Sequence, residues 1–229
     1  NPRTQEGEYL TPPEWRIYMN RGQKTMERIL PFAAFIPLAS FKIWASTPRP
    51  AESLLRVACI MAIVCIGIII LAYRLDKPSY FDWAISAYFI AAALLLSLMP
   101  QTGRKIFTNY AVTGIYLSLF LASFLPPVMG MEPFTQHFAR KTAPPEVWQN
   151  PLFIRINTVM TRVWSGIFAA CMLLSLYPSV ITRALIPLSL IIFLGVPFNM
   201  KFPDFYLKKK GLPSQKEMRE MFTSDKQKQ

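Results

Sequence analysis

The segment VACIMAIVCIGIIILAY, residues 57–73, holds 17 consecutive residues without a charge. Two more uncharged stretches follow, with 17 residues at 83–99 and 25 residues at 106–130. A surface helix of a soluble domain keeps one polar side for water, whereas these segments have none. With their flanking residues they reach the roughly 20 residues needed to cross the ~30 Å apolar core of a bilayer. The sequence therefore predicts an all-α, polytopic transmembrane helix bundle.

The apolar stretches and the prolines between them place the spans. Residues 29–200 are expected to form the transmembrane bundle, preceded by an N-terminal segment, 1–28, with an interfacial helix. The first span contains Pro31, Pro37 and Lys42, so a re-entrant half-helix is the alternative there. A long loop is expected at 130–157 and a basic tail at 201–229. The six predicted spans are about 29–45, 54–73, 83–99, 106–125, 158–177 and 181–200.

The net charge is +12, with 25 Lys and Arg against 13 Asp and Glu. In the six-span topology, 19 of the 25 basic residues lie on the side of both termini and 6 on the other side. Because cytoplasmic loops are enriched in Lys and Arg, both termini are expected in the cytoplasm, and the protein in the cell inner (cytoplasmic) membrane. This topology accounts for the basic balance, so no nucleic-acid partner is expected. The cluster Lys208, Lys209 and Lys210 is predicted to meet anionic lipid at the membrane surface.

The most individual stretch of the chain is EPFTQHFARKTAPPEVWQNPLFIRINTVMTRVW, residues 132–164. It mixes aromatic, charged and proline residues at one predicted membrane face. Trp side chains favour the headgroup level, and Arg or Lys suits lipid phosphates. A ligand site and a purely structural interfacial anchor both remain open. The candidate ligand-binding or lipid-binding residues are His137, Arg140, Lys141, Trp148 and Trp164.

Part of this stretch, residues 133–164, resembles an uncharacterised family of bacterial integral membrane proteins. The shared pattern is PFT, then FAR, then VW, P-x-F, and a spaced Asn, Thr and Trp that lead into a span. That family has no assigned reaction. The resemblance therefore implies a bacterial membrane setting and no activity.

Groups that would carry catalysis or a cofactor are sparse. No Asp or Glu falls within a predicted span, although ion-coupled transporters usually place one there. The three cysteines lie in apolar stretches without a CxxC pattern, which predicts neither a disulfide framework nor a metal site. The single histidine, His137, cannot supply both axial ligands of a membrane haem. No catalytic residue and no cofactor are therefore expected from this chain alone.

Three functions fit these features. The first is a non-catalytic membrane subunit, an anchor or scaffold of a larger and possibly energy-converting or redox assembly, with lipid and other subunits or further copies of itself as partners. The second is a small transporter or channel for a neutral or lipid-like solute, because prolines in the first and last spans can break helices around a site. The third is a membrane enzyme acting on lipid or quinone, with the long loop as its active site.

Overall fold

The structure is a computed structural model that describes residues 37, 38, 40, 41, 51–75, 78–141, 143, 145–177 and 179–214. This part of the chain is helical and contains no strand. Of the predicted first span, only Pro37, Leu38, Ser40 and Phe41 are described, and they are helical. The rest of that span, the N-terminal segment and the tail from residue 215 lie outside the described residues.

The described chain forms long helices joined by short connections. Five helical segments are long and apolar enough to cross a membrane, namely Ser53–Arg74, Tyr80–Leu98, Gln101–Val128, Pro151–Ser175 and Ile181–Lys209. The elements are α4 (Ala51–Leu75), α5 (Tyr80–Leu98), α6 (Gln101–Val128), α7 (Phe134–Arg140), the 3₁₀ turn η1 (Pro145–Val147), α8 (Pro151–Ser175), the π-helical turn η2 (Ile181–Leu185), α9 (Ile186–Ser189), the π-helical turn η3 (Leu190–Gly195) and α10 (Val196–Lys209).

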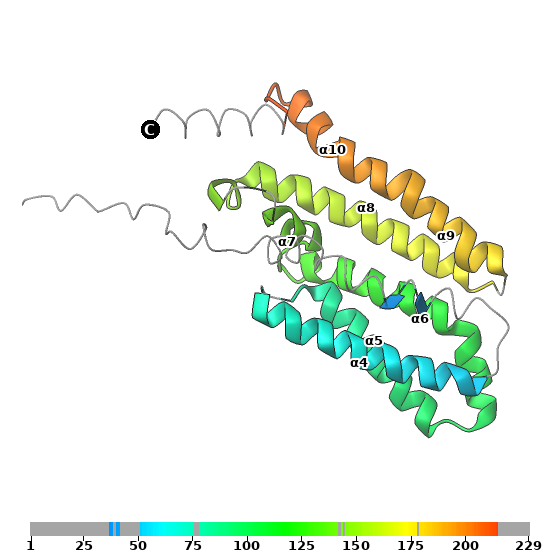
Figure 1. Cartoon of the computed structure of the whole chain (residues 1–229). Helices are drawn as coiled ribbons and strands as arrows, with labels where there is room; N and C mark the ends of the chain where they lie inside the picture. Colours follow the sequence, from blue (N-terminus) through cyan, green and yellow to red (C-terminus); the bar gives the residue numbers. More distant parts are fainter. Residues whose placement is uncertain are drawn as a thin grey trace, which may run out of the picture.

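The long helices run up and down beside one another, as their short connections require. Figure 1 shows α6 between the α4–α5 pair and α8, with the segment from η2 to α10 on the far side of α8. The two most extensive helix contacts are α6 with α8 and α4 with α5. The short helix α7 lies against α8 and α6 at the end of the bundle where α6 ends and α8 begins.

The core lies where α4, α5, α6 and α8 meet. Aromatic rings fill its centre: Phe41 and Phe89 are fully buried, with ring centroids 5.1 Å apart in an edge-to-face arrangement. Such pairs add to the gain from burial because ring edges are positive and faces negative. The other fully buried large side chains of this core are Leu54, Phe81, Ile85, Leu96 and Cys171.

Helix α6 continues through Pro126 and Pro127, past the end predicted at residue 125. It ends at Val128 with a Schellman motif, in which the Met131 N–H donates to the Pro126 carbonyl (2.8 Å) and the Gly130 N–H to that of Pro127. Gly130 has φ +74°, a conformation that favours glycine. The prolines do not stop the helix, because the N–H groups that hold its last turn belong to Met129, Gly130 and Met131. The missing N–H groups of Pro126 and Pro127 are not needed there.

Helix α8 begins at Pro151, seven residues before the predicted start at 158. The Asn150 side chain accepts a hydrogen bond from the Leu152 N–H (2.9 Å), and Pro151 occupies the first helical position. The helix therefore contains Arg155 and Asn157, which the hydrophobic pattern places outside the span. The connection after α6 is correspondingly shorter than predicted, and α7 lies within it.

The last segment stays helical from Ile181 to Lys209, nine residues beyond the predicted end at 200. Two π-helical turns end in hydrogen bonds that reach back five residues, from the Ile186 N–H to the Ile181 carbonyl and from the Val196 N–H to the Ile191 carbonyl. A proline, Pro187 or Pro197, lies two residues after the end of each turn. A proline ring clashes with the carbonyl four residues earlier in an ordinary α-helix, and a widened turn relieves that clash.

At the opposite end of the bundle from α7, Arg183 joins three elements. Its Nε donates to the Ser175 carbonyl at the end of α8 (3.3 Å), and its Nη2 donates to the Asn109 carbonyl of α6. A guanidinium near the last carbonyls of a helix complements their partial negative charge. Arg183 therefore fixes the end of the α6–α8 pair to the start of the last segment.

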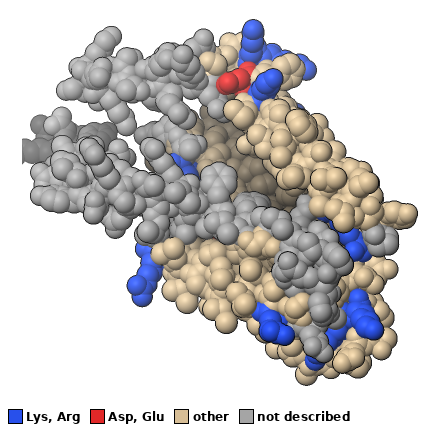
Figure 2. All heavy atoms as spheres, turned by 45° about the vertical axis from the view of Figure 1, so that its right-hand side comes forward, with Lys and Arg blue, Asp and Glu red and all other residues tan. Residues whose placement is uncertain are grey.

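The outer surface of the bundle is largely apolar. Large side chains such as Ile63, Leu98 and Phe193 are 70%, 84% and 78% exposed. Figure 2 shows a broad surface without charge, with Lys and Arg gathered toward its edges. A soluble protein rarely exposes so much contiguous apolar surface, so this distribution agrees with a membrane protein.

Candidate functional site

The polar residues of the 132–164 stretch converge around α7. This seven-residue helix is held down by Phe134, which is buried with its ring centroid 4.4 Å from that of Phe81 on α5. Phe134 also contacts Phe138, one turn later, edge to face at 6.2 Å. The aromatic anchor presses one side of α7 against the bundle, and the polar residues Thr135 and Gln136 are also buried.

Thr135 connects α7 to α8 through buried hydrogen bonds. Its hydroxyl donates to the Asn157 carbonyl (2.7 Å) and lies 2.8 Å from the Thr161 hydroxyl. The Thr135 backbone N–H donates to the same Thr161 oxygen at 3.4 Å. Thr161 is fully buried. In an apolar surrounding, such groups must pair because unpaired ones are costly.

Hydroxyl pairs continue along the α6–α8 contact. The Ser165 hydroxyl, one turn beyond Thr161, donates to the Ser123 hydroxyl at 2.9 Å. Further along, the Ser175 hydroxyl lies 2.9 Å from that of Thr113. Small hydroxyl residues let helices approach closely and bond across their interface. The Asn157, Thr161 and Ser165 face of α8 is therefore a helix–helix contact rather than an open polar path.

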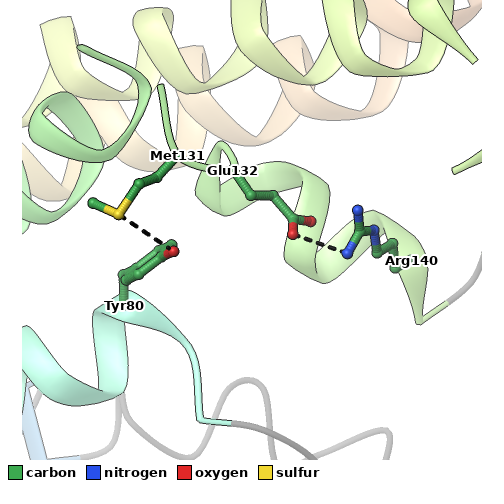
Figure 3. Close-up of polar contacts among 4 residues, drawn as sticks. All are labelled: Tyr80, Met131, Glu132 and Arg140. Carbon is green, nitrogen blue, oxygen red and sulfur yellow. Dashed lines mark hydrogen bonds and ion pairs between the residues drawn. The ribbon is translucent and has the colours of Figure 1, made fainter. Parts of the chain in front are cut away.

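A second polar group lies at the other side of α7. Figure 3 shows Glu132, just before the helix, joined to Arg140 at its end, with 2.9 Å between Oε2 and Nη1. The guanidinium carbon of Arg140 lies 5.3 Å from the centroid of the Trp148 ring, within cation–π range. The Trp148 indole N–H donates to the Ala143 carbonyl (3.0 Å), which fixes the ring under the cation.

Three buried atoms of this group have no hydrogen-bond partner among the described residues. They are Oε1 of Glu132, Nε of Arg140 and Oε1 of Gln136. Gln136 lies four residues after Glu132 and four before Arg140, and it is only 4% exposed. We refer to Glu132, Gln136 and Arg140 as the α7 polar site.

Burial raises the pKa of Glu132 above its ordinary value, and the nearby Arg140 charge opposes this effect without cancelling it. In the pH range just above the ordinary glutamate pKa of roughly 4.3, the folded state then binds more protons than the unfolded state. The free energy of unfolding is therefore expected to fall as pH rises through that range.

This pH dependence can be isolated by comparing the wild type with Glu132→Gln. Thermal unfolding of both proteins in mild detergent, measured from pH 4 to pH 7, gives the difference in Tm. The wild type is expected to lose stability relative to the variant as pH rises, because only the wild type carries the ionising carboxyl group. A difference that grows in favour of the wild type would show that the attraction of Arg140 outweighs burial.

The structure brings together some of the residues singled out by the sequence and separates others. Arg140 and Trp148 are in contact. Lys141 is exposed at the end of α7, and the His137 ring lies edge to face with Phe138 at 5.7 Å. Lys208, Lys209 and Lys210 are exposed at the end of α10.

Trp164 does not belong to the α7 polar site. Its indole N–H donates to the Asn199 side-chain oxygen on α10 at 3.4 Å, and its ring lies 5.5 Å from that of Phe168. The ring also covers Gly195, where an added Cβ would come within 2.6 Å of it, so the ring would have to shift. Trp164 therefore packs the last segment onto α8.

Three residues of these networks, Thr135, Gln136 and Thr161, are not among the candidates that the sequence supplied. For Thr161 the signal was present as spacing, because Asn157, Thr161 and Ser165 recur every four residues and so share one face of a helix. No group of three or more His, Cys, Asp or Glu side chains that could hold a metal ion occurs among the described residues.

No protein-family model matches the chain, and neither a curated protein nor a solved structure was found to be similar to it.

Proposed function

We propose that this chain is a non-catalytic integral membrane subunit that anchors or scaffolds a larger membrane assembly. The observation that carries the proposal is the outer face of the last segment, Ile181–Lys209. Over its most apolar run of 18 residues, only 11% of the residues are buried inside the protein, whereas the corresponding share is 39% in α6 and in α8. Among the described elements, its main contacts are with α8 alone.

A polar group in the middle of that face favours a protein partner over lipid. Ser189 is exposed and has no hydrogen bond in the described part of the chain. Other span hydroxyls bond to their own helix, as those of Ser97 and Thr158 do with the carbonyls four residues earlier (2.7 and 2.8 Å). Span serines commonly bond to neighbouring helices. We refer to Leu185, Leu188, Ser189, Ile192 and Val196 as the outer face.

The interior of the bundle supports a structural role. The hydroxyl pairs Ser123–Ser165 and Thr113–Ser175 join α6 to α8, so these polar groups are engaged in packing. The transporter alternative drew on helix breaks at prolines of the first and last spans. The last segment is helical through Pro187 and Pro197, which favours the structural role for that segment.

The distribution of Lys and Arg supports an orientation of the bundle in the membrane, which is part of the same proposal. The described chain holds 13 Lys and Arg; four lie at the end where α6 begins, eight lie toward the end that carries α7 and the end of α10, and Arg162 lies near the middle of α8. By the positive-inside rule, we expect the second end to face the cytoplasm, as both termini do in the six-span topology. An inner-membrane location is part of the same proposal.

Gentle detergent extraction from the native membrane tests the proposal. Native gel separation and mass spectrometry of the co-migrating chains are expected to show this chain in a stoichiometric assembly with other proteins. Migration of the chain alone would contradict the subunit function and leave transport as the function to assay.

A substitution on the outer face tests the docking surface itself. Ser189→Trp is expected to remove at least about nine-tenths of the co-purifying partner, because a large ring prevents close helix approach. Ile63→Trp on α4, where the side chain is 70% exposed, is the matched control and should leave the assembly intact. Equal assembly in both variants would show that the outer face meets lipid.

A further inference from the structure

The α7 polar site has an unusual balance of hydrogen-bonding groups. Glu132 and Gln136 each present a buried acceptor oxygen without a donor, and Arg140 presents a buried Nε–H without an acceptor. Buried polar atoms without partners are uncommon in native proteins because they have lost their water. A molecule that fits here must donate hydrogen bonds at one end and accept one at the other.

The charged groups of the site also separate into a part that suits an anion and a part that suits a cation. Arg140 uses Nη1 for Glu132, which leaves Nε for a second, negatively charged acceptor. A phosphate suits a guanidinium because charge-assisted hydrogen bonds to it are strong and directional. The free Glu132 oxygen and the Gln136 carbonyl oxygen suit a primary ammonium group, which has three donors and no acceptor.

Apolar surface adjoins the site on one side. Val128, Met129 and Met131, which directly precede Glu132, are 66%, 69% and 38% exposed. Figure 3 shows Met131 approached by the Tyr80 hydroxyl of α5, 3.8 Å from its sulfur, beside the Glu132–Arg140 pair. Tyr side chains favour the level of the lipid headgroups. A ligand with a zwitterionic head and apolar tails would contact both surfaces at once.

We propose that the α7 polar site binds the headgroup of an aminophospholipid such as phosphatidylethanolamine. The ammonium group donates to Glu132 and Gln136, the phosphate accepts from Nε of Arg140, and the acyl chains lie on the Val128–Met131 surface. Trp148 holds the guanidinium in place through the cation–π contact. Binding requires no proton transfer, because the carboxylate, the guanidinium and the ammonium group all take part in their charged forms.

Native mass spectrometry of the full chain in mild detergent tests the assignment with three lipids that carry the same acyl chains. Phosphatidylethanolamine is expected to be retained at least about tenfold more strongly than phosphatidylcholine, whose trimethylated nitrogen donates no hydrogen bond. It should also exceed phosphatidylglycerol, which has the phosphate but no ammonium group.

Variants locate the preference. Gln136→Met keeps the length of the side chain and removes the acceptor, and it should bring the ethanolamine and choline lipids to within about twofold of each other, as should Glu132→Gln. Lys209→Gln changes an exposed charge at the same membrane end and should keep the full preference. Using both site variants guards against one of them failing to fold.

Three results would overturn the assignment. Equal retention of all three lipids would mean that only the phosphate is attracted. A preference that survives both site variants would mean that the ammonium group is recognised elsewhere on the protein. Absence of retained lipid in the wild type, with normal thermal stability, would mean that water molecules satisfy the three atoms.

Discussion

Replacing Gly114 with alanine is expected to lower the Tm of the protein in mild detergent by several degrees. A Cβ at this position would lie 2.7 Å from Cε2 of Tyr88 on α5, a distance that real side chains do not show. The Tyr88 ring cannot turn away freely, because its hydroxyl donates to the Ala111 carbonyl at 2.6 Å and its ring packs edge to face on Phe89. Either the hydrogen bond or the α5–α6 spacing must give way.

Gly114→Ala has two opposing effects on the free energy of unfolding. Alanine stabilises a helix by up to about 1 kcal/mol relative to glycine. Overpacking a well-filled contact costs about 1–3 kcal/mol, so the clash is expected to dominate. Each kcal/mol shifts Tm by roughly 2–4 °C in a chain of this size.

Gly67 and Gly166 provide matched controls, since a Cβ at either position would meet no atom within 4 Å. Gly67→Ala and Gly166→Ala should leave Tm unchanged or raise it slightly. If Gly114→Ala behaves like these two variants, the close approach of Tyr88 to α6 is wrong.

The spans could be predicted because a local property of the sequence determines them. An uncharged stretch long enough for the bilayer identifies α4, α5 and α6 wherever the rest of the chain lies. Their exact ends could not be predicted the same way, because α8 and the last segment continue past the apolar stretch on capping and dipole interactions. Asn150 caps the first, and Lys208 and Lys209 lie in the last turn of the second.

The site was only partly predictable because its contacts depend on packing between elements. Arg140 and Trp148 could be singled out by residue type, yet their contact needs the 3₁₀ turn η1 to bring residue 148 back over residue 140. Helix α7 has seven residues, too few for a recognisable hydrophobic period. Hydroxyls such as Thr113 look scattered in the sequence until the partner helix is placed beside them.

Thr161→Val is expected to destabilise the protein by about 1–3 kcal/mol, the cost of leaving a buried partner without its hydrogen bond. Valine has almost the same shape, so the packing of this fully buried position is kept. What is lost is the oxygen that lies 2.8 Å from the Thr135 hydroxyl and accepts from the Thr135 N–H. That N–H has no substitute acceptor in the contact, so α7 is expected to loosen from α8.

Thr158→Val is the control on the same helix, because the Thr158 hydroxyl bonds only to the Ile154 carbonyl of its own helix (2.8 Å). It should change the free energy of unfolding by no more than about 0.5 kcal/mol. The double variant Thr135→Val with Thr161→Val should be less destabilised than the sum of the single variants, because either single change already removes the contact between the two hydroxyls and that contact can be lost only once. Because Thr135 and Gln136 are neighbours on α7, Thr161→Val should also weaken the preference for the ethanolamine lipid, whereas Thr158→Val should not. Additive single variants with an unchanged lipid preference would show that the α7–α8 contact does not position the polar site.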